Sequence, residues 1–273
     1  MPITRVGDLD IAWDVAGPAD GAAVLMINGL GAARQSWAVQ VEALSQTYRV
    51  YTFDNRDVGE TGAGEHPAPY AMTMFAKDSA ALIEALEIGP VHVIGASMGG
   101  AIAQELMLLR PDLVRSAQIV CSWARSDRWL AELFGQWKSM FREMGPLAWA
   151  RNSWLWVFTH RWYRDPHHLE TLVRDAATYP HPQSAEMFDR QSDAAIAFDA
   201  RDRLGAVDVP VHVIVGAEDI FTPIRLSEEI AAAIPGARLT VLPDAGHGMF
   251  WETPVAFNTA LIGFLDATSV DSG

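Results

Sequence analysis

Residues 91–100 read VHVIGASMGG and place Ser97 between a short, mostly apolar run and a pair of glycines. The run before the serine is typical of a buried parallel strand, and the sequence AIAQELMLL after it predicts a helix. Residues 95–99 form a G-x-S-x-G pattern. In a tight strand-to-helix turn this pattern exposes the serine hydroxyl, and glycine tolerates the strained backbone and close packing. Ser97 is therefore the candidate nucleophile; an ordinary turn with an inert serine is the alternative.

The sequence on both sides of this segment alternates between short apolar runs and helical patterns. Further strands are predicted at residues 23–27, 48–53, 114–121, 211–215 and 238–242. This alternation indicates βαβ units, and hence a mostly parallel sheet with helices on both faces. One of the intervening helices is expected to begin with Thr222 as N-cap and Pro223 at its first position.

One long stretch breaks the alternation. Residues 122–205 contain no convincing strand and have a helical pattern throughout. We expect a core made of residues 1–121 and 206–273, with residues 122–205 as a helical cap. Ligand sites in such sheets lie at the carboxyl ends of the strands, so an insertion there would cover the site.

The composition limits the classes of partner. The chain has 273 residues, a formal net charge of −14 and a single cysteine, Cys121. An acidic surface repels nucleic-acid phosphates and anionic lipids, so we expect neither a nucleic acid nor a membrane as partner. The lone cysteine, with no signal peptide or long apolar stretch, predicts a cytoplasmic protein. The sequence leaves a homodimer open.

A serine in such a turn needs a base and an acid. His247 lies in DAGHG, directly after the last predicted strand, so it should reach the same edge of the sheet as Ser97. Asp219 lies in VGAED after the preceding strand and would orient the imidazole. Asp127 is the alternative acid. Glu218 should point away if Asp219 points inward.

Acyl transfer also needs donors for the oxyanion that forms on the substrate carbonyl. We expect the backbone N–H of Met98, at the start of the helix, to be one donor. Leu30 is the candidate for the second, because it lies in the loop after the strand at residues 23–27.

Five segments together resemble one known group. NGLG, FDNRDVGET, IGASMGG, VGAEDIFTP and DAGHGMFWETP occur in the order and spacing of α/β-hydrolase-fold carboxylesterases. Within that superfamily the chain is most similar to the branch containing 3-oxoadipate enol-lactonases and anthracycline-type methyl esterases. The resemblance implies a mostly parallel eight-stranded sheet and ester or lactone hydrolysis through an acyl-enzyme without a cofactor or metal. It also implies a triad of Ser97, Asp219 and His247, and oxyanion donors at Leu30 and Met98.

Two positions depart from the usual pattern. Asn28 stands where many members carry histidine, and Asp57 stands where many carry glycine. We expect both to affect the choice of substrate more than the chemistry. The cluster of Asp54, Arg56 and Asp57 is expected to lock a loop through ion pairs rather than contact a polar substrate. Haloalkane dehalogenases and epoxide hydrolases carry aspartate where this chain has Ser97, which argues against those activities.

The helical stretch is rich in aromatic residues, most of which should pack it onto the core. The remaining rings would enclose an apolar pocket, so we expect a small-molecule ester or lactone with a hydrophobic or aromatic group. The pocket residues expected are Asn28, Trp123, Trp129, Trp154 and Met249. Alternatives are a C–C bond hydrolase of vinylogous diketones, a cofactor-free perhydrolase and, last, a ligand receptor with slow turnover.

Overall fold

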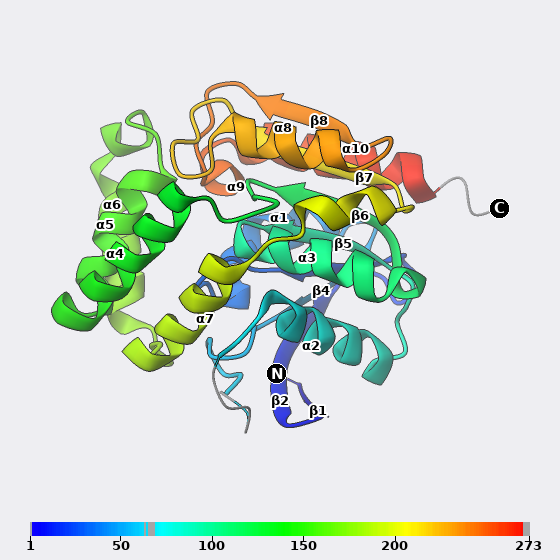
Figure 1. Ribbon diagram of the computed structural model, residues 1–273, viewed down its shortest axis with the longest axis horizontal. Helices are drawn as coiled ribbons and strands as arrows, with labels where there is room; N and C mark the ends of the chain where they lie inside the picture. The colour runs from blue at the N-terminus through cyan, green and yellow to red at the C-terminus, as the bar shows by residue number, and fades with distance from the viewer. Residues whose placement is uncertain (1, 63, 65–68, 270–273) are drawn as a thin grey trace.

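A computed structural model describes residues 2–62, 64 and 69–269 (Figure 1). Its centre is an eight-stranded sheet in the order β1-β2-β4-β3-β5-β6-β7-β8. The strands are β1 (Ile3–Val6), β2 (Leu9–Ala16), β3 (Ala23–Ile27), β4 (Arg49–Phe53), β5 (Val91–Ala96), β6 (Val114–Val120), β7 (Val211–Gly216) and β8 (Arg238–Leu242). Strand β2 pairs antiparallel with β1 and with β4, and the pairs from β4 through β8 are parallel.

Helices cover both faces of the sheet. The apolar side chains of α2 (Met72–Ala85), α3 (Met98–Leu109) and α8 (Ile224–Ala233) belong to one buried cluster. Those of α1 (Ala38–Leu44), α9 (Met249–Glu252) and α10 (Pro254–Ser269) belong to a second cluster. Every residue of β5 and β7 is buried, as expected of strands covered on both faces.

Residues 122–205, all of which the structure describes, contain no strand. We call them the helical segment. It contains α4 (Arg128–Met144), α5 (Pro146–Val157), α6 (Pro166–Thr178) and α7 (Ala185–Ala197), with short 3₁₀ turns at Trp162–Arg164 and, across the return to the sheet, Arg201–Ala206. Figure 1 shows α4 to α7 gathered at one end of the molecule, beside the ends of the central strands. The remaining 3₁₀ turns, Arg34–Trp37 and Pro111–Leu113, precede α1 and β6.

The predicted start of the helix after β7 is wrong by one residue. Helix α8 begins at Ile224, Pro223 occupies the N-cap position, and no side chain caps the helix. Thr222 does not act as the cap; its hydroxyl hydrogen-bonds instead to Asp219, three residues earlier in the chain.

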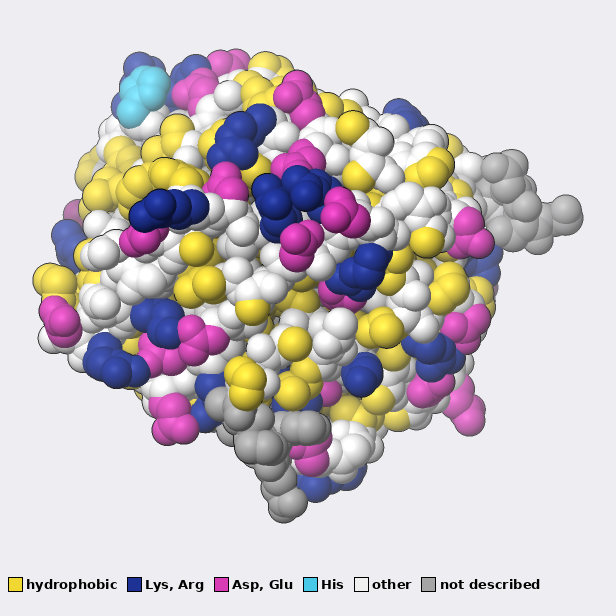
Figure 2. Space-filling view, viewed as in Figure 1, with side chains coloured by type: hydrophobic (Ala, Val, Ile, Leu, Met, Phe, Trp, Pro, Cys, Tyr) yellow, Lys and Arg dark blue, Asp and Glu magenta, His cyan; other side chains and the backbone are white. Residues whose placement is uncertain are grey.

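The surface is mixed in charge. Figure 2 shows basic and acidic side chains interspersed on one face, with hydrophobic side chains gathered toward the end that carries the helical segment. Met144 and Leu155 in that segment are 65% and 58% exposed. Within residues 2–62, 64 and 69–269, no helix has the length and apolar character needed to cross a membrane.

Candidate active site

Ser97 occupies a strained turn between β5 and α3. Its φ of 55° lies in a region that residues with a side chain rarely adopt. The surrounding backbone fixes this conformation, since the Ser97 N–H donates to Val120 O at 2.8 Å and the Ser122 hydroxyl donates to Ser97 O at 2.8 Å. The strained conformation is therefore stabilised by the end of β6 and by Ser122, two residues after it.

The glycines of the turn are required by close approach of backbone atoms. A Cβ at Gly95 would lie 2.2 Å from Gly99 O, and a Cβ at Gly99 would lie 2.1 Å from Ile27 O. Both distances are far inside van der Waals contact. The G-x-S-x-G pattern thus allows α3 to begin against the end of β3, which brings the loop after β3 next to Ser97.

His247 and Asp219 are brought together by the loops after β8 and β7. The His247 Nδ1 and Asp219 Oδ2 atoms are 2.8 Å apart, and both side chains are buried. Since this bond and the 3.0 Å contact with Thr222 Oγ1 both engage Nδ1, Nε2 is the ring nitrogen left to act on a substrate or on Ser97. Burial lowers the pKa of the imidazole, but Cys121 and the Asp219 carboxylate outweigh it and hold the pKa of His247 above its ordinary value.

Asp219 is itself held by a set of donors that sequence reasoning missed in part. Its Oδ1 accepts from the backbone N–H groups of Phe221 and Thr222, at 2.9 and 2.8 Å, and its Oδ2 lies 2.8 Å from Thr222 Oγ1. The carboxylate is therefore fixed with one oxygen toward the imidazole. The adjacent Glu218 pairs instead with Arg161, as expected for a side chain that points away.

Asp127, the alternative acid, lies elsewhere. Its carboxylate accepts from Leu130 N at 2.9 Å, as the N-cap of α4, and pairs with Arg225 at 2.8 Å. Neither contact involves His247, so the geometry favours Asp219.

The loop after β3 passes directly against the serine. A Cβ built on Gly29 would lie 3.2 Å from Ser97 Cβ and 3.7 Å from Ser97 Oγ. Among the described residues, the backbone N–H groups of Leu30 and Met98 have no protein acceptor. Two unpaired donors beside a hydroxyl are what an oxyanion site requires.

A cavity of about 810 Å³ contains this group of residues. Ser97, His247, Asn28 and Leu30 line it, together with many aromatic residues. These include Trp37, Trp137, Trp149, Trp154, Phe221 and Phe250. Among the described residues, no lysine or arginine lines the cavity. Its chemistry therefore suits an uncharged, largely apolar ligand.

Of the residues expected to form the pocket, Asn28 and Trp154 line the cavity, whereas Trp123, Trp129 and Met249 are not among its lining residues. Trp123 is fully buried against Phe134, with ring centroids 5.5 Å apart, because it directly follows the buried end of β6. Met249 is buried in the core beside α10. Trp129 lies on the outer side of α4, 40% exposed and packed on Trp156. Trp137 and Trp149 line the cavity instead.

Three side chains lie close enough to share a metal ion. In the described part of the chain this group is Cys121, Asp219 and His247, whose candidate ligand atoms lie within 4.8 Å of one another. However, a cation bound at about 2.0–2.2 Å from each atom would hold the His nitrogen and Asp oxygen farther apart than the observed 2.8 Å. That separation is a hydrogen bond, so the arrangement suits proton transfer rather than metal ligation.

Comparison with known proteins agrees with this architecture. Residues 22–254 match the family described as alpha/beta hydrolase fold. The chain is 31% identical over 265 residues to the protein named "Putative carbamate hydrolase RutD" of Azorhizobium caulinodans, covering 97% of this chain and 98% of that protein. It is 35% identical over 262 residues to "Putative non-heme bromoperoxidase BpoC" of Mycobacterium tuberculosis, covering 94% and 97%.

Solved structures give the same result. The crystal structure of the enol-lactonase from Burkholderia xenovorans LB400 superposes with a TM-score of 0.88 at 26% identity, covering 97% of this chain and 100% of that one. A thermophilic esterase from Thermogutta terrifontis superposes with a TM-score of 0.86 at 25% identity, covering 98% and 99%. The predicted fold and the predicted resemblance are confirmed, and the chain belongs to the alpha/beta hydrolase fold family.

Proposed function

We propose that the protein is a serine hydrolase that cleaves carboxylic esters or lactones through an acyl-enzyme. The observation that carries this proposal is the shared cavity: Ser97 in its strained turn and His247 bonded to Asp219 line one space. The enol-lactonase and esterase neighbours support the same chemistry.

In the proposed reaction His247 Nε2 takes the proton of Ser97 Oγ as this oxygen attacks the carbonyl carbon. The negative charge that forms on the carbonyl oxygen is stabilised by the N–H groups of Leu30 and Met98. Asp219 stabilises the imidazolium, which then protonates the leaving alkoxide. Water repeats the sequence on the acyl-enzyme, releasing the acid and restoring Ser97. Since the imidazole must be neutral to accept a proton, activity rises with pH as His247 deprotonates.

The cavity walls support an uncharged substrate with a hydrophobic or aromatic group. Aromatic side chains from the helical segment, such as Trp137, Trp149 and Trp154, face the end of the sheet that carries Ser97. We therefore propose that residues 122–205 act as a cap on a core formed by residues 1–121 and 206–273. A carboxylate in the substrate would find no lysine or arginine among the described lining residues.

The proposal is tested by replacing the nucleophile. Ser97→Ala should reduce the hydrolysis of p-nitrophenyl butyrate by at least about 10⁴-fold while the melting temperature stays close to that of the wild type. A fluorophosphonate should label the wild type at Ser97 only. Ser79→Ala, which changes a buried serine on α2 that hydrogen-bonds within its own helix, is the matched control and should keep full activity. Equal rates in wild type and Ser97→Ala would refute the proposal.

A second candidate is perhydrolysis on the same acyl-enzyme. It is favoured by the 35% identity to a protein named as a non-heme bromoperoxidase. Hydrogen peroxide would replace water, attack the acyl carbon and leave as a peracid, which oxidises bromide. Peroxide- and acetate-dependent bromination that is absent in Ser97→Ala would support this activity, and ester hydrolysis without bromination would reject it.

A further inference from the structure

We propose that Gln191 of α7 is a positioning residue for the oxyanion site. It holds the loop of residues 28–31 in the conformation that leaves the Leu30 N–H free for a substrate oxygen. The inference rests on the proposed ester hydrolysis and assigns a catalytic consequence to a residue of the helical segment.

Gln191 bridges two loops of the core with one side chain. Its Oε1 accepts from the Gly31 N–H at 3.1 Å, and its Nε2 donates to Arg56 O at 2.7 Å. Gln191 is fully buried; its bond to Arg56 O is buried and its bond to the Gly31 N–H is partly buried. Gly31 follows β3 and Arg56 follows β4, which are neighbours in the sheet. Both bonds therefore act at the sheet edge where Ser97 lies.

The bond to Gly31 determines which N–H of the loop remains available. Leu30 and Gly31 are consecutive, and Gly31 has a φ of +66°. With the Gly31 N–H held by Gln191, the peptide between Leu30 and Gly31 cannot rotate without breaking this hydrogen bond and leaving the buried Gln191 Oε1 unpaired. Fixing that peptide fixes the backbone of Leu30, whose own N–H has no acceptor among the described residues. Ser97 lies beside the same loop at Gly29.

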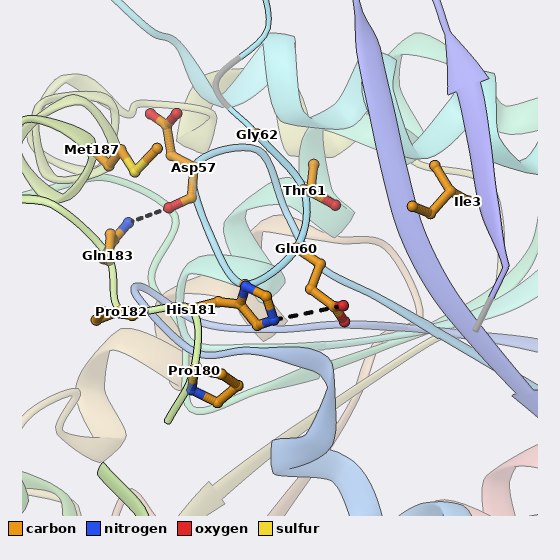
Figure 3. A pocket seen from close by; sticks show the side chains of 11 residues that line it. Ile3, Asp57, Glu60, Thr61, Gly62, Pro180, His181, Pro182, Gln183 and Met187 are labelled. Carbon is orange, nitrogen blue, oxygen red and sulfur yellow. Dashed lines mark hydrogen bonds and ion pairs between the residues drawn. The ribbon is translucent and has the colours of Figure 1, made fainter. Parts of the chain in front are cut away.

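Helix α7 makes further contacts with the loop after β4 that are separate from the two bonds of Gln191. The neighbouring Arg190 pairs with Asp57 through two bonds, at 2.8 and 3.0 Å. Gln183, just before α7, donates to Asp57 O at 2.8 Å. Both residues line a second cavity of about 540 Å³ (Figure 3). Arg56, whose carbonyl accepts from Gln191, is fixed by Asp78 through two bonds of 2.6 and 2.7 Å.

The contacts of Asp54, Arg56 and Asp57 bear on whether this cluster locks the loop after β4 or binds a polar substrate. Asp54 accepts from the Arg34 N–H at 2.7 Å and pairs with its guanidinium, while Arg56 and Asp57 pair with Asp78 and Arg190. Each of these charged groups therefore has an ion-pair partner inside the protein, as expected for a cluster that locks the loop. None of the three lines the cavity that contains Ser97.

The test compares two variants of the same helix. Gln191→Met removes both bonds at similar volume, and Arg190→Lys weakens the docking of α7 without touching the loop of residues 28–31. We expect Gln191→Met to lower kcat for p-nitrophenyl butyrate about 10- to 100-fold, a partial loss of one oxyanion donor, with KM changed less than about 3-fold. Arg190→Lys should lower the melting temperature and leave kcat within about 2-fold.

A trifluoromethyl ketone separates this role from a purely structural one. Such an inhibitor forms an anionic hemiketal on the serine, so its affinity depends on the oxyanion donors. Its Ki should rise in Gln191→Met by the same factor as kcat falls, and it should not change in Arg190→Lys. Unchanged kcat and Ki in Gln191→Met, with only the melting temperature lowered, would overturn the inference.

The experiments also distinguish a failure of the proposed function from a failure of the proposed role of Gln191. A wild type that neither hydrolyses esters nor reacts with a fluorophosphonate would refute the proposed function, and the catalytic role of Gln191 with it. An active wild type with an active Gln191→Met variant would refute the inference alone. If Gln191→Met does not fold, Gln191→Ala, which leaves room for water, is measured in the same way. Hydrogen exchange at the Gly31 amide, faster in the variant, reports the loosened loop independently of turnover.

Discussion

The central strands and the helical segment are built on different principles. Strands β5 and β7 are buried at every residue, and the loops at their carboxyl ends hold Ser97 and Asp219 through backbone hydrogen bonds. In the helical segment, α6 has no buried residue, and α4 and α5 meet the cavity mainly through aromatic rings. Hydrogen bonds to the backbone hold Ser97 and Asp219 in fixed positions, whereas the aromatic rings set the size and shape of the cavity.

This difference leads us to expect separate roles for the two regions, catalysis at the strand ends and substrate selection in the helical segment. Changes at the strand ends should alter the rate of the chemical step, and changes in the helical segment should alter which substrates bind. Gln191 is the exception, because it is a residue of the segment that reaches a core loop with two hydrogen bonds. The predictions below test this division, from the largest expected effect to the smallest.

The largest effect is expected at Asp219. In Asp219→Asn the amide oxygen should replace Oδ1, which accepts from two backbone N–H groups, and the NH₂ group should replace Oδ2, which faces His247. The imidazole would then carry its proton on Nε2 and could not accept the proton of Ser97. We expect kcat to fall by about 10⁴-fold, measured with p-nitrophenyl butyrate.

The fold should survive this substitution, because every hydrogen bond of residue 219 keeps a suitable partner, the one to His247 with its direction reversed. Circular dichroism and the melting temperature are the controls. A kcat within 10-fold of the wild type would mean that Asp219 does not orient the base, and it would return Asp127 to consideration.

The next effect is the loss of stability in acid, which we expect to arise from histidines of the central strands and not from those of the helical segment. His92 in β5 and His212 in β7 are buried, and burial lowers the pKa of each to about 4, with a smaller contribution from a nearby arginine. The four histidines of the helical segment, His160, His167, His168 and His181, are exposed. Acid should therefore weaken the core rather than the segment.

The sign follows from the proton balance. Below about pH 6.5 His212 is protonated in the unfolded chain, whereas in the folded chain it becomes protonated only near pH 4. The contribution of His212 to the free energy of unfolding is therefore fully present above pH 6.5 and is lost as the pH falls toward 4. We expect a loss on the order of 2 kcal/mol from this residue, measured by urea unfolding. His212→Gln, which can still bond to Gln118 and Thr240, should flatten the dependence. Identical slopes in both proteins would contradict the assignment.

A smaller effect is expected in the helical segment, at Trp154. This residue lines the cavity, whereas Trp129 lies outside it. Trp154→Ala should raise KM for an aromatic ester about 10-fold and leave the hydrolysis of p-nitrophenyl acetate nearly unchanged, since the small acyl group does not need that wall. Trp129→Ala is the matched control. Equal effects of the two substitutions would mean that the cavity wall does not select the substrate.

The same pair of tryptophans shows where sequence reasoning stops. The positions of Ser97, Asp219 and His247 were predictable because each lies in a short motif directly after a recognisable strand, and parallel strands end at one edge. Helical periodicity distinguishes the faces of α4 but not which face meets the cavity, so Trp129, which was expected in the pocket, lies outside the cavity lining. That choice depends on how the helix packs against residues distant in the chain.

Thr222 and Gln191 illustrate the second limit. Thr222 precedes a proline, as an N-cap often does, but its hydroxyl bonds to Asp219 because the loop after β7 folds back on itself. Gln191 contacts Gly31 across 160 positions of sequence. A glutamine on an amphipathic helix carries no local signal for such a bond. The Gln191 bond is a tertiary contact, which no short pattern encodes, whereas the Thr222 bond joins residues three apart and is a local alternative to capping the helix.

The smallest effect is expected at the surface contact between the two regions. Arg161 of the helical segment pairs with Glu218 and, at 2.8 Å, with Asp244, on the loops that precede Asp219 and His247. Its position suggests a latch, yet Arg161 is 38% exposed and Asp244 is 72% exposed. Water and salt screen such pairs, so each contributes no more than about 1 kcal/mol.

Arg161→Gln should accordingly lower the melting temperature by no more than about 4 °C and leave kcat and KM within about 2-fold. The difference in melting temperature between the variant and the wild type should become smaller as the salt concentration is raised. By contrast, Phe134 and Trp137 of α4 pack on Phe221 with ring centroids 5.9 and 4.9 Å apart, beside the imidazole of His247. These apolar contacts do not weaken with salt, so they rather than the ion pairs hold the segment over the site. A large loss of activity in Arg161→Gln would mean that the ion pairs matter more than the ring contacts. The helical segment would then position the loops of Asp219 and His247 through its surface charges.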